Sequence, residues 1–277
     1  MRRHRRRNLL ILSLLAVAAL ALAATVVSAR RDNDSVELRA GDLLIKGRGG
    51  FKPETLPKRH DAPIKIYGGG KVSTISGELP PILETLTFEF DKHGHVDTTG
   101  LEVCTAGKLQ ATDVPAARRA CPQAIVGKGY GTATVAFPEQ KPFPVSSPIT
   151  IFNGPKVHGF DSVLAHAYTT VPVATTFIVP VVIEKIHKGV YGYRINVKIP
   201  SIVNGYGHPI SGSAKVGKKW TIKGKKHSYI NARCETGHFQ VRGEFSFKEG
   251  PEEAPAAAAE VNQILKANFL LPCQVRK

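Results

Sequence analysis

The strongest constraint on the fold is an alternation of side chains near the middle of the chain. Apolar residues stand at every second position from Tyr191 to Ile199, and polar or small residues stand between them. A period of two places the two sets on opposite faces of a β-strand, whereas in a helix the apolar residues would scatter around the axis. We therefore predict a strand with Tyr191, Tyr193 and Ile195 on a core-facing side.

The preceding segment, residues 176–183, is apolar almost throughout, which predicts a strand buried on both faces. A chain of 277 residues can bury a full core, and its 26 glycines and 19 prolines supply the turns of an all-β fold. Roughly eleven strand-like segments follow one another at hairpin spacing. This pattern favours a mainly β fold, an antiparallel β-sandwich, built as one domain or as two fused β subdomains that divide near residue 140.

The expected domain organisation has three parts. Residues 1–29 form a signal peptide or N-terminal membrane anchor, residues 30–62 an irregular tether, and residues 63–277 the β-sandwich domain. Gly68, Gly69 and Gly70 predict a bulge or bend in an early strand of that domain. The alanine-rich residues 251–267 predict a helical insertion or a linker.

The N-terminal segment has the features of an export signal. Arginines crowd its first seven residues, residues 9–27 are almost wholly apolar, and Val27, Ser28 and Ala29 offer the small residues of a cleavage site. As an uncleaved helix the apolar run would reach about 28 Å and could anchor the protein in a membrane. In both cases the body of the protein is expected outside the cytoplasm, either secreted or anchored.

Four cysteines in an exported chain favour two disulfides over a metal site. Cys104 and Cys121 flank a predicted short helix, with Thr112 or Asp113 as its N-cap and Pro115 in its first turn, so they are natural partners. Cys234 and Cys273 would then form the second bridge, although four cysteines allow three connectivities.

The chain is strongly basic, with 38 Lys and Arg against 22 Asp and Glu, a formal charge of +16. Without the five arginines of residues 1–29, 33 basic residues remain against 22 acidic ones, which gives +11. Such a charge draws a protein towards anionic envelope polymers or surfaces, and it also simply aids solubility. Nothing in the sequence predicts a specific nucleic-acid partner, and the oligomeric state stays open.

One local cluster of lysines is the candidate binding surface. It surrounds the single tryptophan and comprises Lys215, Lys218, Lys219, Trp220, Lys223, Lys225 and Lys226. Lysines attract phosphate or sulfate groups, and an exposed indole would stack on a base or sugar. In the alternative interpretation Trp220 belongs to the core and the lysines protect an edge hairpin.

Two histidine pairs are weaker candidates. His93 and His95 could share a metal ion with Asp91 or Asp97, or they belong to a polar hairpin turn. His166 and Tyr168 share one face of a strand and could act as acid and base, or His166 is a buried residue bonded to a backbone carbonyl.

The sequence lacks the linear motifs of nucleophilic hydrolases, zinc proteases, phosphate-binding loops and dinucleotide-binding folds. We therefore expect no cofactor and favour a non-enzymatic structural or binding role. The alternative is an extracellular carbohydrate-active hydrolase, which would use two carboxylates on facing strands. Its candidates are Glu84, Glu89, Glu184 and Glu244, none of which the pattern singles out.

The order of several short motifs resembles a group of exported β-rich proteins of soil actinomycete-type bacteria. The motifs include Ala117-Arg-Arg-Ala-Cys121, Phe152-Asn-Gly154, His166-Ala-Tyr168, Ala232-Arg-Cys234 and Pro272-Cys273. The resemblance covers roughly two thirds of the chain and implies export and disulfide formation. It implies no activity, because none is characterised in that group, and the alanine-rich stretch after Pro251 departs from its pattern.

Overall fold

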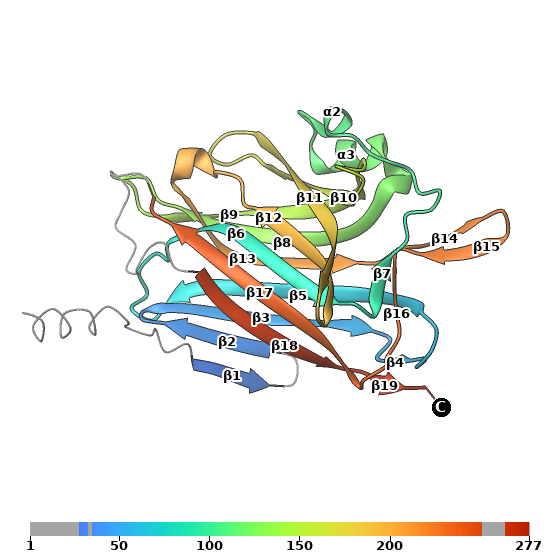
Figure 1. The fold of residues 1–277 in the computed structure, drawn as a ribbon. Coiled ribbons are helices and arrows are strands. Elements are labelled where there is room, and N and C mark those ends of the chain that lie inside the picture. Colours follow the sequence, from blue (N-terminus) through green and yellow to red (C-terminus); the bar gives the residue numbers. More distant parts are fainter. Residues whose placement is uncertain (1–27, 33–34, 251–263, 277) are drawn as a thin grey trace, which may run out of the picture.

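The computed structural model describes residues 28–32, 35–250 and 264–276, and it consists mainly of one large antiparallel β-sheet (Figure 1). Along the sheet the strands follow the order β1-β2-β3-β5-β13-β8-β9-β10-β11-β12-β6-β17-β18, and β7 and β16 pair beside β5. The strands β14 and β15 form a separate hairpin, and β4 and β19 form a short parallel pair. A mainly β fold is therefore confirmed.

The elements have the following bounds: β1 Ser28–Asp32, β2 Ser35–Ala40, β3 Leu43–Lys52, β4 Thr55–Leu56, β5 Ala62–Thr74, β6 Ile82–Asp91, β7 Gly94–Val96, α2 Ala106–Leu109, α3 Val114–Ala120, η1 Pro122–Ala124, β8 Ile125–Val135, β9 Phe143–Asn153, β10 Asp161–Thr169, β11 Thr175–Lys188, β12 Tyr191–Lys198, η2 Val203–Gly205, β13 Gly207–Val216, β14 Lys219–Ile222, β15 Lys225–Ser228, β16 Ile230–Ala232, β17 His238–Lys248, β18 Ile264–Pro272 and β19 Gln274–Val275.

The sheet rolls up so that its two ends face each other and nearly close (Figure 1). Leu38 of β2 and Ile45 of β3 share one buried cluster with Phe245 of β17 and Leu265 of β18. Burial of apolar side chains from both ends holds the roll shut. This arrangement gives every strand of the rolled sheet an inward face and an outward face.

A second buried cluster lies at the other end of the rolled sheet. It contains Phe51, Ile64, Ile151, Tyr229 and Phe239, and the Phe51 and Phe239 rings meet edge to face at 5.0 Å. The disulfide between Cys234 and Cys273, whose Cα atoms are 6.0 Å apart, belongs to the same cluster. It ties the end of the chain to the segment between β16 and β17.

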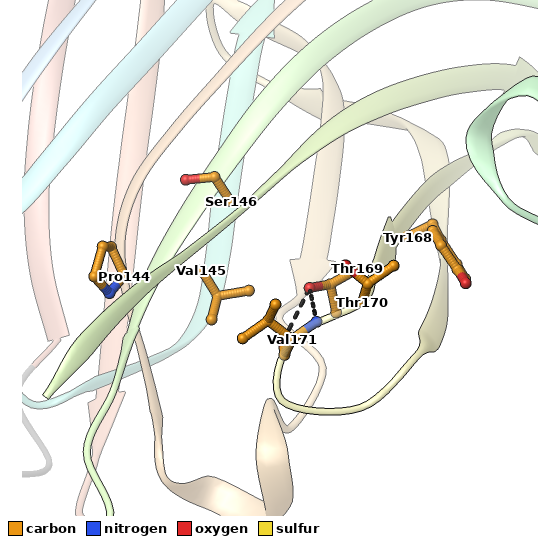
Figure 2. Close-up of a pocket in the computed structure, with 7 residues that line it drawn as sticks. All are labelled: Pro144, Val145, Ser146, Tyr168, Thr169, Thr170 and Val171. Carbon is orange, nitrogen blue, oxygen red and sulfur yellow. Dashed lines mark hydrogen bonds between the residues drawn. The ribbon is translucent and has the colours of Figure 1, made fainter. Parts of the chain in front are cut away.

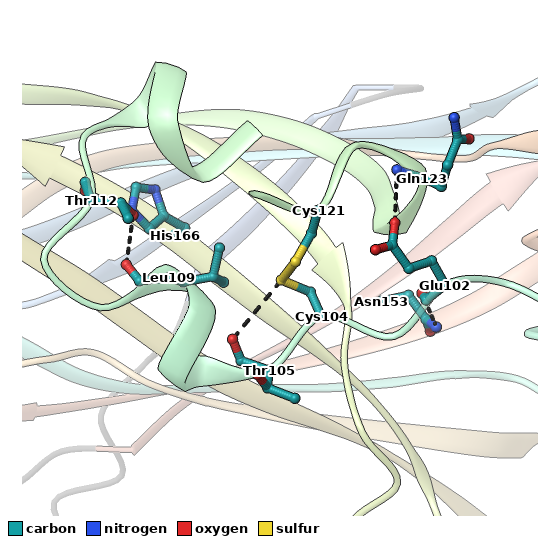
Figure 3. Close-up of a disulfide and its surroundings, with 9 residues drawn as sticks. All are labelled: Glu102, Cys104, Thr105, Leu109, Thr112, Cys121, Gln123, Asn153 and His166. Atoms are coloured by element: carbon teal, nitrogen blue, oxygen red, sulfur yellow. Dashed lines mark hydrogen bonds between the residues drawn. A yellow bond between two sulfur atoms is a disulfide. The ribbon is translucent and has the colours of Figure 1, made fainter. Parts of the chain in front are cut away.

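The helical corner covers the outward face of β9 and β10, because Phe152 and Leu164 of these strands share a buried cluster with Leu109 and Ala117 of the helices. Figure 3 shows the disulfide of this corner. The side chain of Asp113 accepts a hydrogen bond from the Ala116 backbone N–H at 2.7 Å, which confirms it as the N-cap of α3. The predicted disulfide between Cys104 and Cys121 closes this corner, and both cysteines are fully buried. Two disulfides favour an oxidising compartment outside the cytoplasm.

The predicted tether 30–62 is wrong for the residues that the structure describes. Strands β2 and β3 occupy most of it and belong to the main sheet, because Val36, Leu38 and Ile45 alternate into the core. The predicted bulge at Gly68–Gly70 is also wrong, since β5 runs through these glycines in unbroken register with β3 and β13.

Three further expectations change in the structure. Residue 140 lies in the connection between β8 and β9, which pair along their length, so a division there is wrong. Of the alanine-rich stretch, residues 251–263 lie outside the described residues, while Ile264–Ala267 belong to β18 rather than to a helix. Tyr191 and Tyr193 do not share a face, because a β-bulge between them shifts the register with β6.

The segment 176–183 is not buried on both faces, contrary to the prediction. Within it only Val181 is fully buried, at 6 % exposure, and Pro180 is exposed. The proposed signal or anchor in residues 1–29 falls almost entirely outside the described residues. Every helix in the described part of the chain is too short or too polar to span a bilayer.

Candidate anionic-ligand surface

The outward face of four adjacent strands carries only positive charge. Strands β3, β5, β13 and β8 contain no Asp or Glu, and all of their Lys and Arg residues point outward. We call this surface the outer basic face. It comprises Lys46, Arg48, Lys52, Lys65, Lys71, Lys128 and Lys215.

The register of the sheet sets these cations directly opposite one another. Lys52 faces Lys65, Lys46 faces Lys71, and Lys215 faces Lys128, each across one pair of neighbouring strands. Neighbouring strands lie about 4.8 Å apart, and like charges directly opposite each other destabilise a sheet. The register therefore brings three pairs of like charge together on one surface.

Within the described ranges, carboxylates reach this face only at its edge, on the side of β2 and after β3. Lys46 pairs with Glu37 of β2 at 3.0 Å, and Lys52 pairs with Glu54. Among the described residues no acidic partner lies against Lys128 or Lys215. Instead, Arg118 of α3 donates a hydrogen bond to Thr150, which stands directly opposite Lys128, so the helical corner adds a further cation.

Two tyrosines and a floor of small residues complete the surface. Tyr67 lies opposite Lys215, and Tyr130, half exposed, lies opposite Ser213. A Cβ on Gly50 would stand 2.5 Å from Tyr67 Oη, so the tyrosine side chain lies against the bare backbone there. The Tyr67 ring therefore fills the space above Gly50, whereas the ring of Tyr130 stays accessible.

The predicted lysine cluster does not form one surface. Lys215 belongs to the outer basic face, whereas Lys218 donates to the carbonyl of Gln123 and has its pKa lowered by burial. On the β14–β15 hairpin, Lys225 shares a face with Trp220, while Lys219 and Lys226 point to the opposite side. Lys223 stands in the turn between the two strands.

Trp220 is half buried rather than free. Its indole N–H donates to the carbonyl of Thr99 at 3.1 Å, and its ring stacks on His227 at a centroid distance of 5.6 Å. His227 is itself held by Asp97 at 2.9 Å. Burial alone would raise the pKa of the Asp97 carboxyl, but hydrogen bonds from His227 and Thr99 outweigh it and lower that pKa. The ring therefore packs against the body of the protein.

The metal candidates His93 and His95 are turned towards carboxylates. The His93 ring lies between Asp91 at 2.7 Å and Glu235 at 2.8 Å, and His95 lies 3.1 Å from Asp61. In the described ranges, no group of three or more His, Cys, Asp and Glu side chains has the arrangement of a metal site.

Of the four glutamates considered for hydrolysis, Glu89, Glu184 and Glu244 all act on the same arginine, Arg194. Glu184, Arg194, Glu89 and Arg242 form one outward row across β11, β12, β6 and β17, in which the charges alternate. We call this row the compensated face. Arg194 stands between the two glutamates, 2.8 Å from Glu89 and 3.8 Å from Glu184.

Glu89 is the most enclosed carboxylate of the row, with a side-chain exposure of 6 %. Lys188 at 3.4 Å and Arg242 at 3.2 Å also approach it, the latter without hydrogen-bond geometry. Burial tends to raise the pKa of Glu89, but the Arg194 hydrogen bond and the three cations together lower it. The carboxylate therefore stays ionised and fixed, which suits a structural role better than proton transfer.

His166 and Tyr168 are separated in their roles although they share one face of β10. His166 is fully buried beneath the helical corner, with Nε2 3.0 Å from the Thr112 carbonyl (Figure 3), and burial lowers its pKa. Tyr168 lines a shallow hollow of about 180 Å³ at the end of β10, together with Val145, Thr169 and Val171 (Figure 2).

Sequence reasoning missed the outer basic face because its pairs are distant in the chain. Lys128 and Lys215 meet only through strand pairing, whereas the hairpin lysines are close in the sequence. Comparison with models of protein families, with curated proteins and with solved structures finds no match to this chain.

Proposed function

We propose that the protein is an exported, non-enzymatic binding protein of the cell envelope or extracellular space that contacts an anionic polymer through the outer basic face. One observation carries the proposal: Lys128 and Lys215 face each other on strands that contain no carboxylate, and among the described residues neither has an acidic partner. A repeating phosphate or sulfate polymer would place negative charge between these two lysines and remove the repulsion. The two disulfides support a place outside the cytoplasm, secreted or held by the N-terminal segment.

Retention on immobilised polyphosphate tests this role. The double variant Lys128→Gln/Lys215→Gln removes the central pair, and we expect it to elute at clearly lower salt than the wild type. Lys225→Gln/Lys226→Gln is the matched control, because it removes the same charge from the hairpin. We expect its elution to stay close to that of the wild type.

Two results would contradict the proposal. If the two double variants lost retention equally, only net charge would matter and no defined surface would exist. If the wild type eluted from the column with a neutral control protein in low salt, electrostatic binding itself would be absent.

A further inference from the structure

Apolar side chains gather at one end of the rolled sheet, the end that holds the first buried cluster. The neighbouring strands β5, β13, β8, β9 and β10 each have one terminus at this end. Exposed or half-buried apolar residues stand at these termini: Ile75, Phe137, Phe143, Val171, Val173 and Tyr206. We call this set the apolar rim.

The residues of the rim meet from one connection to the next. The Phe137 ring lies 5.4 Å from the ring of Tyr206 and 6.3 Å from that of Phe143, measured between centroids. Two residues after Phe143, Val145 lines the same shallow hollow as Val171 (Figure 2). A contiguous apolar patch that stays exposed marks a surface for contact with a partner or a membrane.

The connection between β10 and β11 is the most exposed part of the rim. Residues 170–174 contain no charged side chain, and in them Val173 is 68 % exposed, more than any other large apolar residue in the described part of the chain. At the opposite end of the sheet Val190 is exposed too, at 37 %, but it stands in a turn between Lys188 and Tyr191, and its carbonyl accepts the N–H of Lys92. The rim therefore differs from the other end in presenting valines without a neighbouring cation.

The chain enters the sheet at the same end. Ser28, at which the described structure begins, starts β1 opposite Arg39, one residue before β2 ends. The turn after β2 is tied to the rim, because the Ile75 N–H donates to the Asp42 carbonyl at 2.9 Å. Residues 9–27, the apolar run predicted as a signal or an anchor, would therefore join the folded domain beside the rim.

We propose that the apolar rim lies against the lipid bilayer in which residues 9–27 anchor the protein, an inference that rests on the anchored form of the proposed function. Aliphatic side chains such as Val171 and Val173 bury into the boundary with the acyl chains, and aromatic rings sit at the level of the head groups. The strands then point away from the membrane, which leaves the outer basic face free for an anionic polymer.

The few charges of the rim agree with this placement. The four connections that carry it, residues 75–81, 136–142, 170–174 and 199–206, contain three charged side chains, those of Glu78, Glu139 and Lys141. Charges of both signs at this low density would remain in the polar head-group layer.

A fluorescent label on the full chain, reconstituted into phosphatidylcholine–phosphatidylglycerol liposomes, tests the proposal. Val173→Cys carries a nitrobenzoxadiazole group, and Val190→Cys, an exposed valine at the opposite end, is the matched control. All four native cysteines are in disulfides, so only the added thiol reacts. We expect the emission of the Val173→Cys label to move to shorter wavelength and to be quenched by lipids with a nitroxide on the acyl chain, whereas the control label stays in water. Val171→Cys replaces Val173→Cys if that variant fails to fold.

Three results would overturn the proposal. The rim label could remain in water, or both labels could be quenched equally, which would mean that the domain has no defined orientation on the bilayer. A shift to shorter wavelength without quenching by the lipid nitroxide would place a second copy of the chain on the rim instead of lipid. Polyphosphate retention of the same variants separates this inference from the proposed function: a quenched rim label with no retention contradicts only the polymer role, and normal retention with an unquenched label contradicts only the membrane contact.

Discussion

Two outward surfaces of the same sheet arrange their charged residues in opposite ways: one alternates positive and negative charges, and the other carries positive charges alone. On the compensated face, Glu184, Arg194, Glu89 and Arg242 alternate in sign across four strands, and the central carboxylate has three cations around it. On the outer basic face, Lys215 stands opposite Lys128 without a carboxylate between them. On the compensated face the charges neutralise one another, whereas on the outer basic face the charges of Lys128 and Lys215 would be neutralised by a bound anion.

The two surfaces also differ in the exposure of a tyrosine side chain. Tyr191 is 6 % exposed and is covered by Arg242, whose Cζ lies 4.7 Å from the ring centroid. Tyr130 on the outer basic face is 50 % exposed. A surface that contributes to stability buries its aromatic ring beneath a cation, while a surface that binds a partner keeps its ring accessible.

The largest expected difference between the faces concerns arginine. Arg194→Met removes the closest partner of the buried Glu89 carboxylate, and we expect the free energy of unfolding to fall by about 2 kcal/mol. This is less than the usual cost of breaking a buried ion pair, because Lys188 and Arg242 remain beside the carboxylate. Arg48→Met is the same substitution on the outer basic face, and we expect its free energy of unfolding to stay within about 0.5 kcal/mol of the wild-type value. Urea unfolding at neutral pH measures both, and equal losses would remove the distinction between the faces.

Acidification should act through the compensated face. The pKa of Glu89 is lowered in the folded protein, so its stabilising contribution is complete above its ordinary pKa of 4.5 and is lost as the pH falls through the folded value. We expect wild-type stability to decline more steeply below about pH 4.5 than that of Glu89→Gln. Unfolding midpoints at neutral and acidic pH give the comparison, in which Asp42 and Asp97, also shifted downward, contribute equally to both proteins. Parallel pH profiles would contradict it.

Local patterns in the sequence predicted local features of the fold correctly. The alternation from Tyr193 to Val197 follows strand β12, and the spacing of Asp113, Pro115 and Cys121 matches the capped, disulfide-closed helix. Each signal lies within a short segment, where periodicity and capping act directly on the backbone.

Predictions from the sequence were wrong where pairing between distant strands determines the local structure. Glycine in isolation weakens a strand, so Gly47–Gly50 and Gly68–Gly70 indicated a tether and a bend. In the sheet these glycines lie side by side, and pairing with β13 extends the band to Gly212. The same non-local pairing creates the outer basic face, and residues 176–183 lie half buried within the sheet.

Reversing one charge should turn part of the outer basic face into a compensated one. Lys215→Glu places a carboxylate opposite Lys128, and we expect a gain of about 0.5 kcal/mol from the new cross-strand pair. Thermal unfolding in low and high salt measures it, since screening should shrink the gain. The same variant should lose retention on polyphosphate. Unchanged or lower stability in low salt would show that the lysine pair is not repulsive in the wild type.

The smallest expected effect on stability concerns the exposed tyrosine. Tyr130→Ala should change the free energy of unfolding by no more than about 0.5 kcal/mol, because half of the residue is already in water. Its effect on binding depends on the polymer. Polyphosphate has no ring to stack, so retention should match the wild type, whereas a polymer with sugar or base rings should bind more weakly. A large stability loss would instead place Tyr130 with Tyr191, as a residue that the fold itself requires.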